Sequence, residues 1–200
     1  DSGVWEGREG ERNYVSSKLM CWVALDRAVK LAPALGVDPA VWAHERDSIR
    51  DEILTRGWNE DAGAFTGAFD SDHLDASVLL LPIVGFLPAS DPRVEATVAA
   101  IERELVENDL VRRWTGAAPE GAFVMCSYWL AQCHALAGRV DRAREIFERV
   151  TGFANDVDLL SEMVDPSTQL LIGNFPQTLS HAALINAAAT IDQAIETGAA

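Results

Sequence analysis

The chain has 200 residues, 31 of them acidic and 16 lysine or arginine, so its formal net charge is −15 at pH 7. This acidity argues against nucleic-acid binding, because affinity for phosphate groups rests on lysine and arginine side chains. Hydrophobic residues make up 48% of the chain and charged residues 24%, a composition that is typical of a folded globular protein and excludes a disordered one.

The first half of the chain predicts three helices with an irregular connection after the second. Apolar residues recur at spacings of three and four, which place them on one face of a helix. The second helix has the clearest start, because the capping side chain of Asp38 is followed by Pro39 in the first turn. In chain order we expect a buried helix over 14–32, a helix over 38–57, a turn or short hairpin over 58–69 and a strongly apolar helix over 72–81.

The second half predicts four more helices. Asp91 and Pro92 repeat the start signal of a cap followed by proline. One of the four segments is apolar nearly all round, which is typical of a helix buried on most sides, whereas its neighbours are amphipathic. In chain order we expect an amphipathic helix over 91–105, the buried helix over 121–136, its amphipathic partner over 140–150 and a last helix over 177–195.

Buried and solvated helices alternate along the chain, and the sustained period-two alternation that marks strands is missing. This pattern predicts an all-α protein of stacked helical hairpins, arranged as a toroid of helix pairs. No linker rich in proline, serine or glycine divides the sequence. We therefore expect residues 1–200 to form a single unit.

Two further expectations concern the membrane and the redox compartment. The longest apolar stretch, over 78–87, is well short of the roughly 20 residues needed to cross a bilayer, so we expect no membrane span. Cys21, Cys126 and Cys133 are odd in number and lie in apolar surroundings, which favours buried, reduced thiols and a cytoplasmic location. No Cys-x-x-Cys or paired-histidine spacing accompanies them, so no metal site is expected.

Two acids lie in apolar company within loops. Glu6 directly follows Trp5 ahead of the first helix, and Glu162 lies among apolar residues ahead of the last one. Taken singly, each has an ordinary explanation, because acids are common near helix starts and in solvated loops. Their order along the chain, together with several motifs, is more specific.

The motifs resemble those of glycoside hydrolase family 15, the family of glucoamylases, glucodextranases and related bacterial trehalases. The resemblance covers essentially the whole chain and matches the C-terminal half of that family's catalytic domain. The motifs that carry it are Gly-Val-Trp-Glu at 3–6, Ser-Lys-Leu-Met-Cys-Trp at 17–22, Asp-Ala-Ser at 75–77, Gly-Ala-Phe at 121–123 and Gly-Asn-Phe-Pro-Gln at 173–177.

The resemblance implies the fold and the two catalytic acids. The family fold is an (α/α)6 barrel, which agrees with the alternation of buried and solvated helices. By family position, Glu6 is the general acid and Glu162 the general base that activates water. Such an inverting mechanism needs two carboxyl groups about 6.5–9.5 Å apart. Trp5 suits the acid, because an apolar neighbour disfavours the charged form of a carboxyl group.

The resemblance also implies a set of substrate-binding residues. Arg113 matches an arginine that hydrogen-bonds glucose hydroxyls in the first subsite, and Glu120 is expected to reach the same cleft. Trp5, Trp114 and Phe123 complete the set, since aromatic rings stack on the apolar faces of sugars.

The resulting hypothesis is an inverting, exo-acting α-glucosidase that hydrolyses α-linked glucose saccharides in the manner of glucoamylase, as a fragment of a longer enzyme and without a metal or organic cofactor. One alternative is a family 15 trehalase. A second alternative is a non-catalytic helical fragment that binds sugar or a partner. Because a half ring would leave the apolar flanks of 14–32 and 177–195 uncovered, we expect the isolated chain to self-associate or to pair with the missing N-terminal half.

Overall fold

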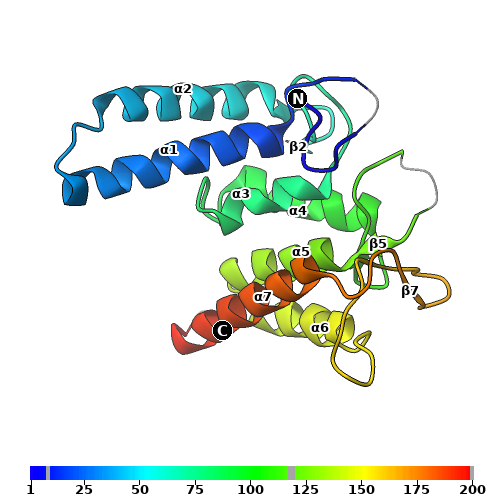
Figure 1. Cartoon of the computed structure of the whole chain (residues 1–200). Coiled ribbons are helices and arrows are strands. Elements are labelled where there is room, and N and C mark those ends of the chain that lie inside the picture. Colours follow the sequence, from blue (N-terminus) through cyan, green and yellow to red (C-terminus); the bar gives the residue numbers. More distant parts are fainter. Residues whose placement is uncertain (8–9, 117–119, 199–200) are drawn as a thin grey trace.

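The computed structural model describes residues 1–7, 10–116 and 120–198, and it is mostly helical (Figure 1). The helices predicted over 14–32, 38–57, 91–105, 140–150 and 177–195 are confirmed to within a few residues at each end. The helices are α1 (Val15–Leu35), α2 (Ala40–Arg56), the short 3₁₀ helix η1 (Ala76–Leu79), α3 (Leu80–Ile83), α4 (Pro92–Leu105), α5 (Val124–Leu136), α6 (Val140–Thr151) and α7 (Thr178–Glu196).

The predicted start of α4 is a good example of how sequence sets a helix boundary. The side chain of Asp91 accepts a hydrogen bond of 2.9 Å from the Arg93 backbone N–H, and Pro92 occupies the first helical position. One side of the helix then carries the buried residues Val94 and Ile101. Cap, proline and apolar stripe act together, so the sequence pattern is enough to place this helix.

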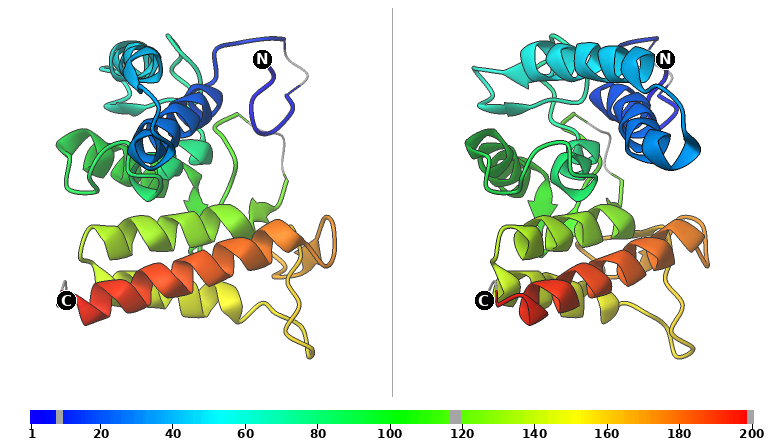
Figure 2. Two further views of the ribbon diagram at one scale, coloured as in Figure 1. Left: turned by 60° about the vertical axis from the view of Figure 1, so that its left-hand side comes forward. Right: turned by 90° about the vertical axis from the view of Figure 1, so that its left-hand side faces the viewer.

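The helices stack as hairpins (Figure 1). α1 lies beside α2 at one end of the stack, α3 and α4 occupy the middle, and α5, α6 and α7 form the other end, an order that Figure 2 shows from two further sides. α5 packs against both α6 and α7, which explains why it is apolar nearly all round. The predicted class, an all-α protein of stacked helical hairpins, is confirmed.

Segments of the loops pair with one another as short strands. The expectation that strands are missing is therefore wrong for these segments. A hairpin pairs β1 (Trp58–Asn59) with β2 (Ala64–Phe65), as predicted for 58–69. A five-stranded antiparallel sheet has the order β3-β4-β5-β6-β7. Strands of two residues are too short to leave a period-two pattern. The five are β3 (Val106–Glu107), β4 (Leu110–Val111), β5 (Ala122–Phe123), β6 (Met163–Val164) and β7 (Leu171–Ile172).

Two predicted helices have different boundaries. The helix expected over 72–81 is η1 followed by α3, because Asp75 is extended, forms a backbone bridge with Trp114 and only then caps η1. The helix expected over 121–136 begins at Val124, because Phe123 and its neighbour belong to β5, which is paired on both sides. In both places tertiary pairing overrides the local helical pattern.

The cysteines differ in exposure. Cys126 and Cys133 are buried in the core, and burial raises the pKa of both thiols. Cys21 is exposed, so the expectation of three buried thiols is wrong for this residue. None of the described helices is long and apolar enough to cross a membrane.

Candidate active site

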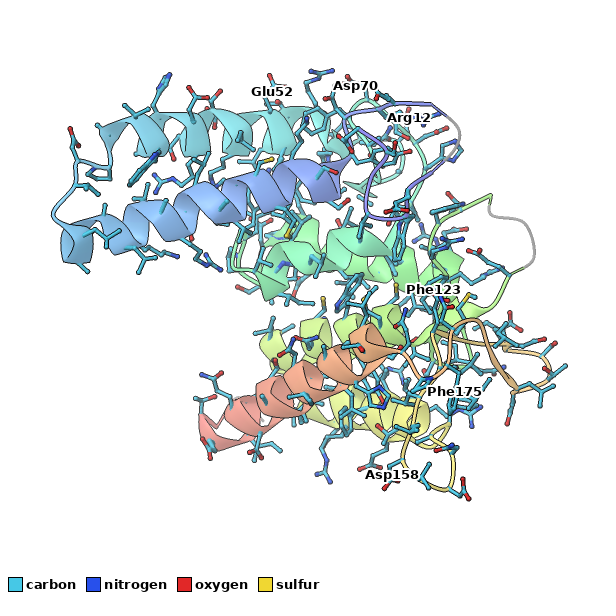
Figure 3. All side chains as sticks on the ribbon, viewed as in Figure 1. Arg12, Glu52, Asp70, Phe123, Asp158 and Phe175 are labelled. Atoms are coloured by element: carbon cyan, nitrogen blue, oxygen red, sulfur yellow. The ribbon has the colours of Figure 1, made fainter. Side chains whose placement is uncertain are left out.

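The N-terminal segment and the loops that follow α4 and α6 gather at one end of the helix stack, where α1, α5 and α7 begin (Figure 1 and Figure 2). The labels of Arg12, Phe123 and Phe175 in Figure 3 mark this end. A pocket of about 490 Å³ opens here. The structure therefore brings residues from both ends of the chain to one place. Of the predicted site residues, the pocket is lined by Trp5, Glu6, Arg113 and Trp114.

Glu6 lies in a tight turn at the rim of this pocket. Its backbone has a φ of +52°, which is uncommon for any residue other than glycine. The Glu6 N–H donates to the Gly3 carbonyl at 3.2 Å, and the Gly7 N–H donates to the Ser2 carbonyl at 2.9 Å. The side chain of Glu6 is exposed. Positive φ at a non-glycine residue persists only where the surrounding structure enforces it, and such residues cluster at functional sites.

Trp5 is fixed by contacts on several sides. Its indole Nε1 donates to both carboxylate oxygens of Asp75, each at 3.0 Å. Its ring centre lies 5.4 Å from that of Phe123 and 6.3 Å from that of Trp114. Asp75 was not a predicted site residue, although it belongs to the Asp-Ala-Ser motif. Burial raises the pKa of its carboxyl group, whereas hydrogen bonds from Ser77 and Trp5 and the charge of Arg113 act in the opposite direction.

Arg113 is held between an acid and aromatic rings. Its Nε donates to Glu120 at 2.9 Å, and its Nη2 donates to the second oxygen of the same carboxylate. The guanidinium carbon lies 4.4 Å from the Trp114 ring centre and 4.7 Å from that of Phe123, within cation–π distance. Glu120 thus reaches the site through Arg113. Phe123 is only 6% exposed and is not among the residues that line the pocket, but its ring contacts both Trp5 and Arg113.

Glu162 has a well-defined hydrogen-bonding environment of its own. Its Oε2 accepts from the backbone N–H of Asn174 at 3.1 Å and from the Asn174 Nδ2 at 3.0 Å, and its Oε1 accepts from the Gln177 Nε2 at 3.3 Å. Gly173 makes room for this, because an added Cβ would lie 2.8 Å from Oε2. Asn174 and Gln177 were part of a quoted motif, but their role is visible only from the contacts.

The five-stranded sheet connects Glu162 to the pocket. Glu162 does not line the pocket, but its carbonyl accepts from the Val124 N–H at 3.1 Å, and Phe123 pairs with Met163 in the sheet. Phe123 in turn packs against Trp5. Phe123 therefore contacts a neighbour of each candidate acid, although 156 positions separate Glu6 from Glu162 in the sequence.

A carboxyl group at the rim of a pocket lined by aromatic rings and an arginine, with a second carboxyl group in a loop at the same end of the helical stack, suits acid–base chemistry on a sugar. Within the described ranges, no group of three or more histidine, cysteine, aspartate or glutamate side chains is arranged to hold a metal ion.

Comparison with known proteins identifies the family. The profile of Glycosyl hydrolases family 15 matches residues 1–189. The chain belongs to this family. It is 41% identical over 205 residues to a trehalase of Mycolicibacterium smegmatis, with 98% of this chain and 30% of that protein covered. It is 37% identical over 202 residues to a trehalase of Thermoplasma volcanium, with 98% and 32% covered. The chain thus spans about a third of the length of these curated relatives.

Solved structures show the same fold at lower identity. A glycosidase in complex with glucose superposes with a TM-score of 0.83 at 21% identity, over 94% of this chain and 54% of that one. A bacterial glucoamylase complexed with acarbose gives 0.76 at 15% identity, over 90% and 33%. The expectation that the chain folds as part of an (α/α)6 barrel is confirmed.

Proposed function

We propose that this family 15 chain is the C-terminal part of the catalytic domain of an inverting α-glucosidase that hydrolyses trehalose. The relatives named trehalase carry the proposal, since two of them align with 98% of the chain at 41% and 37% identity. The glucoamylases among the solved structures are 15% identical or less and bear on the fold alone. The comparisons thus favour the trehalase alternative over the glucoamylase-like reading that the sequence first indicated.

In this proposal Glu6 is the general acid and Glu162 the general base. Glu6 gives its proton to the oxygen between the two glucose units, and Glu162 takes a proton from the water that attacks the opposite face of the anomeric carbon. The environment of Glu162 supports its role, because the three N–H donors from Asn174 and Gln177 hold both carboxylate oxygens in one orientation. No metal or organic cofactor takes part in this mechanism.

Arg113 and Trp114 are proposed to bind the sugar. Glu120 occupies the Nε and Nη2 of Arg113, so the donor we assign to a glucose hydroxyl is Nη1. Trp114 lines the pocket and offers a ring face to a sugar. Trp5 and Phe123 are assigned to the support of this wall.

The exposure of Glu6 fits a catalytic domain that continues beyond this chain. Apolar side chains are also exposed on the first and last helices, for example Leu31 and Leu35 on α1 and Ile185 on α7. We propose that the rest of the barrel covers them and desolvates Glu6. The isolated chain should then self-associate in sedimentation experiments at micromolar concentration and show little activity, and a fully active monomer would contradict this. A cytoplasmic location stays a prediction from the thiols.

The test is the stereochemistry of the products. Cleavage of trehalose with inversion gives one β-glucose and one α-glucose, so proton NMR at early times should show equal amounts of the two anomers. Two α-glucose molecules per trehalose would refute inversion. Release of glucose from maltose or dextrin but not from trehalose would favour the glucoamylase-like reading, and no release from any of them by the full-length protein would favour a binding role.

Substitutions of Glu6 and Glu162 test the role proposed for each acid. Glu6→Gln should lose turnover most on trehalose, whose leaving group is a glucose that must be protonated. It should lose less on α-glucosyl fluoride, whose leaving group needs little protonation. Glu162→Gln should lose turnover on both. The matched control is Glu60→Gln, which removes an exposed acid in the β1–β2 turn.

A further inference from the structure

Asp75 is a buried carboxylate that the proposed reaction does not use. It is 4% exposed, and its carboxylate accepts from two donors: the Trp5 indole N–H, which is shared between both oxygens at 3.0 Å each, and the Ser77 backbone N–H at 2.7 Å. Burying a carboxylate is costly unless hydrogen bonds compensate. A helix cap such as that of η1 needs only one acceptor, and serine or asparagine supplies it without a charge. Capping therefore explains the contact with the Ser77 N–H but not the contact with the Trp5 indole.

The backbone around Asp75 is itself held firmly in place. Asp75 bridges to Trp114, and the Ala76 N–H donates to the Arg113 carbonyl at 2.7 Å. On the other side, a Cβ added to Gly67 would lie 2.8 Å from the Cβ of Asp75. The carboxylate is thus fixed to the segment that carries the proposed sugar-binding residues. It reaches 70 positions back along the sequence to the indole.

Glu6 depends on this anchor. It directly follows Trp5, its φ is +52°, and its carboxyl group makes no hydrogen bond to any residue that the structure describes. Its position is therefore set by the backbone turn, and the indole is the part of that turn that is attached to the core. A shift of the Trp5 ring moves the carboxyl group that must meet the glycosidic oxygen.

We propose that Asp75 is a positioning residue, which clamps the Trp5 indole and thereby holds Glu6 where it can protonate the leaving group. This inference rests on the proposed function for its catalytic consequence, but not for the clamp itself. An asparagine at 75 would keep one acceptor oxygen and turn an NH₂ group towards one of the two donors, so the clamp cannot be complete.

The experiment compares Asp75→Asn with Asp91→Asn in the full-length enzyme. Asp91 is a matched control because its carboxylate caps α4 through the N–H two residues on, as Asp75 caps η1, but it lies away from the pocket. Misplacement of a catalytic group by about 1 Å costs on the order of a hundredfold in rate. For Asp75→Asn we expect a loss of that order in kcat on trehalose, KM within about twofold, and a much smaller loss on α-glucosyl fluoride. Asp91→Asn should change none of these.

The ratio of the rate loss on trehalose to the rate loss on α-glucosyl fluoride distinguishes a positioning role of Asp75 from a purely structural one. A purely structural role lowers the amount of folded enzyme and reduces both rates equally, and this result would overturn the proposal. Unchanged rates on both substrates would overturn it as well.

A second measurement does not depend on activity. In ¹⁵N-indole NMR spectra of the full-length protein, the signal that Trp5→Phe removes is that of the Trp5 indole. This signal should move in Asp75→Asn and stay in place in Asp91→Asn. If it stays in place in Asp75→Asn, the clamp does not exist. If it moves while the wild-type protein hydrolyses no α-glucoside, the proposed function fails and the clamp stands.

Discussion

The hydrogen bonds that hold Glu162 allow a quantitative prediction for Asn174→Ala. This change removes the Nδ2 donor at 3.0 Å but keeps the backbone N–H donor at 3.1 Å and the Gln177 donor at 3.3 Å. It therefore deletes one of three contacts and leaves the loop intact. Gln177→Ala would be less informative, because the Gln177 side chain also caps α7 by accepting from the Ser180 N–H.

The magnitude follows from the charge and the exposure of the pair. A hydrogen bond to a charged group contributes about 1.5–3 kcal/mol. Asn174 is exposed, so water replaces part of the lost interaction and the lower value applies. About 1.5 kcal/mol corresponds to roughly a tenfold change in rate. We expect kcat to fall by about this factor, with a melting temperature close to that of the wild type because no core contact is lost.

The assay is glucose release by the full-length enzyme from trehalose and from α-glucosyl fluoride. A base acts on the water whatever the leaving group is, so both substrates should lose the same factor. Asn186→Ala, which removes the same atoms from an exposed position on α7, is the control and should be indistinguishable from the wild type. An unchanged kcat, or a loss confined to trehalose, would refute the assignment of Glu162 as the base.

Two further predictions use other features of the structure. Gly173→Ala places a Cβ 2.8 Å from the Glu162 Oε2 at a φ of +76°, so it should lower kcat on both substrates at least as much as Asn174→Ala; a fully active variant would show that the Glu162 position is not critical. The hydrogen bond from His134 to Glu102 lowers the pKa of that carboxyl group below its ordinary 4.5. A lowered folded-state pKa stabilises the fold above pH 4.5 and loses this effect as the pH falls through the folded value. Glu102→Gln should therefore be less stable than the wild type at pH 6 in thermal melts, and the gap should close in acid; a gap that does not depend on pH would contradict a stabilising role for the Glu102 charge.

The helices could be predicted where their own side chains determine them. α4 has a proline and a narrow apolar stripe within its 14 residues and a cap directly before them, and all three are local signals. Local signals do not determine the segment before α3, because the extended conformation of Asp75 depends on its bridge to Trp114. The same holds for Phe123, whose strand conformation comes from partners on both sides. Sequence periodicity does not record pairings of this kind.

Some residues of the candidate site could likewise be predicted from the sequence, and others could not. Glu6 and Glu162 follow from ordered motifs, because such motifs keep their place in a sequence whatever surrounds them. Asp75 and Asn174 stood within quoted motifs without a role, since their roles consist of contacts with residues 70 and 12 positions away. A close approach such as that of Gly173 to Glu162 is likewise a property of the folded loop.

The contacts of Phe123 explain how a stack of hairpins can relate two acids from opposite ends of a chain. Its ring lies against Trp5, which the Asp75 clamp fixes, and its backbone pairs with Met163, the neighbour of Glu162. Because Phe123 is also the N-cap residue of α5, a helix that is buried on most sides, neither contact can shift without disturbing the core. The turn with Glu6 and the loop with Glu162 are thus attached to the same rigid point. An inverting reaction requires a fixed separation between acid and base, and a shared anchor in the core is a physical means of maintaining one.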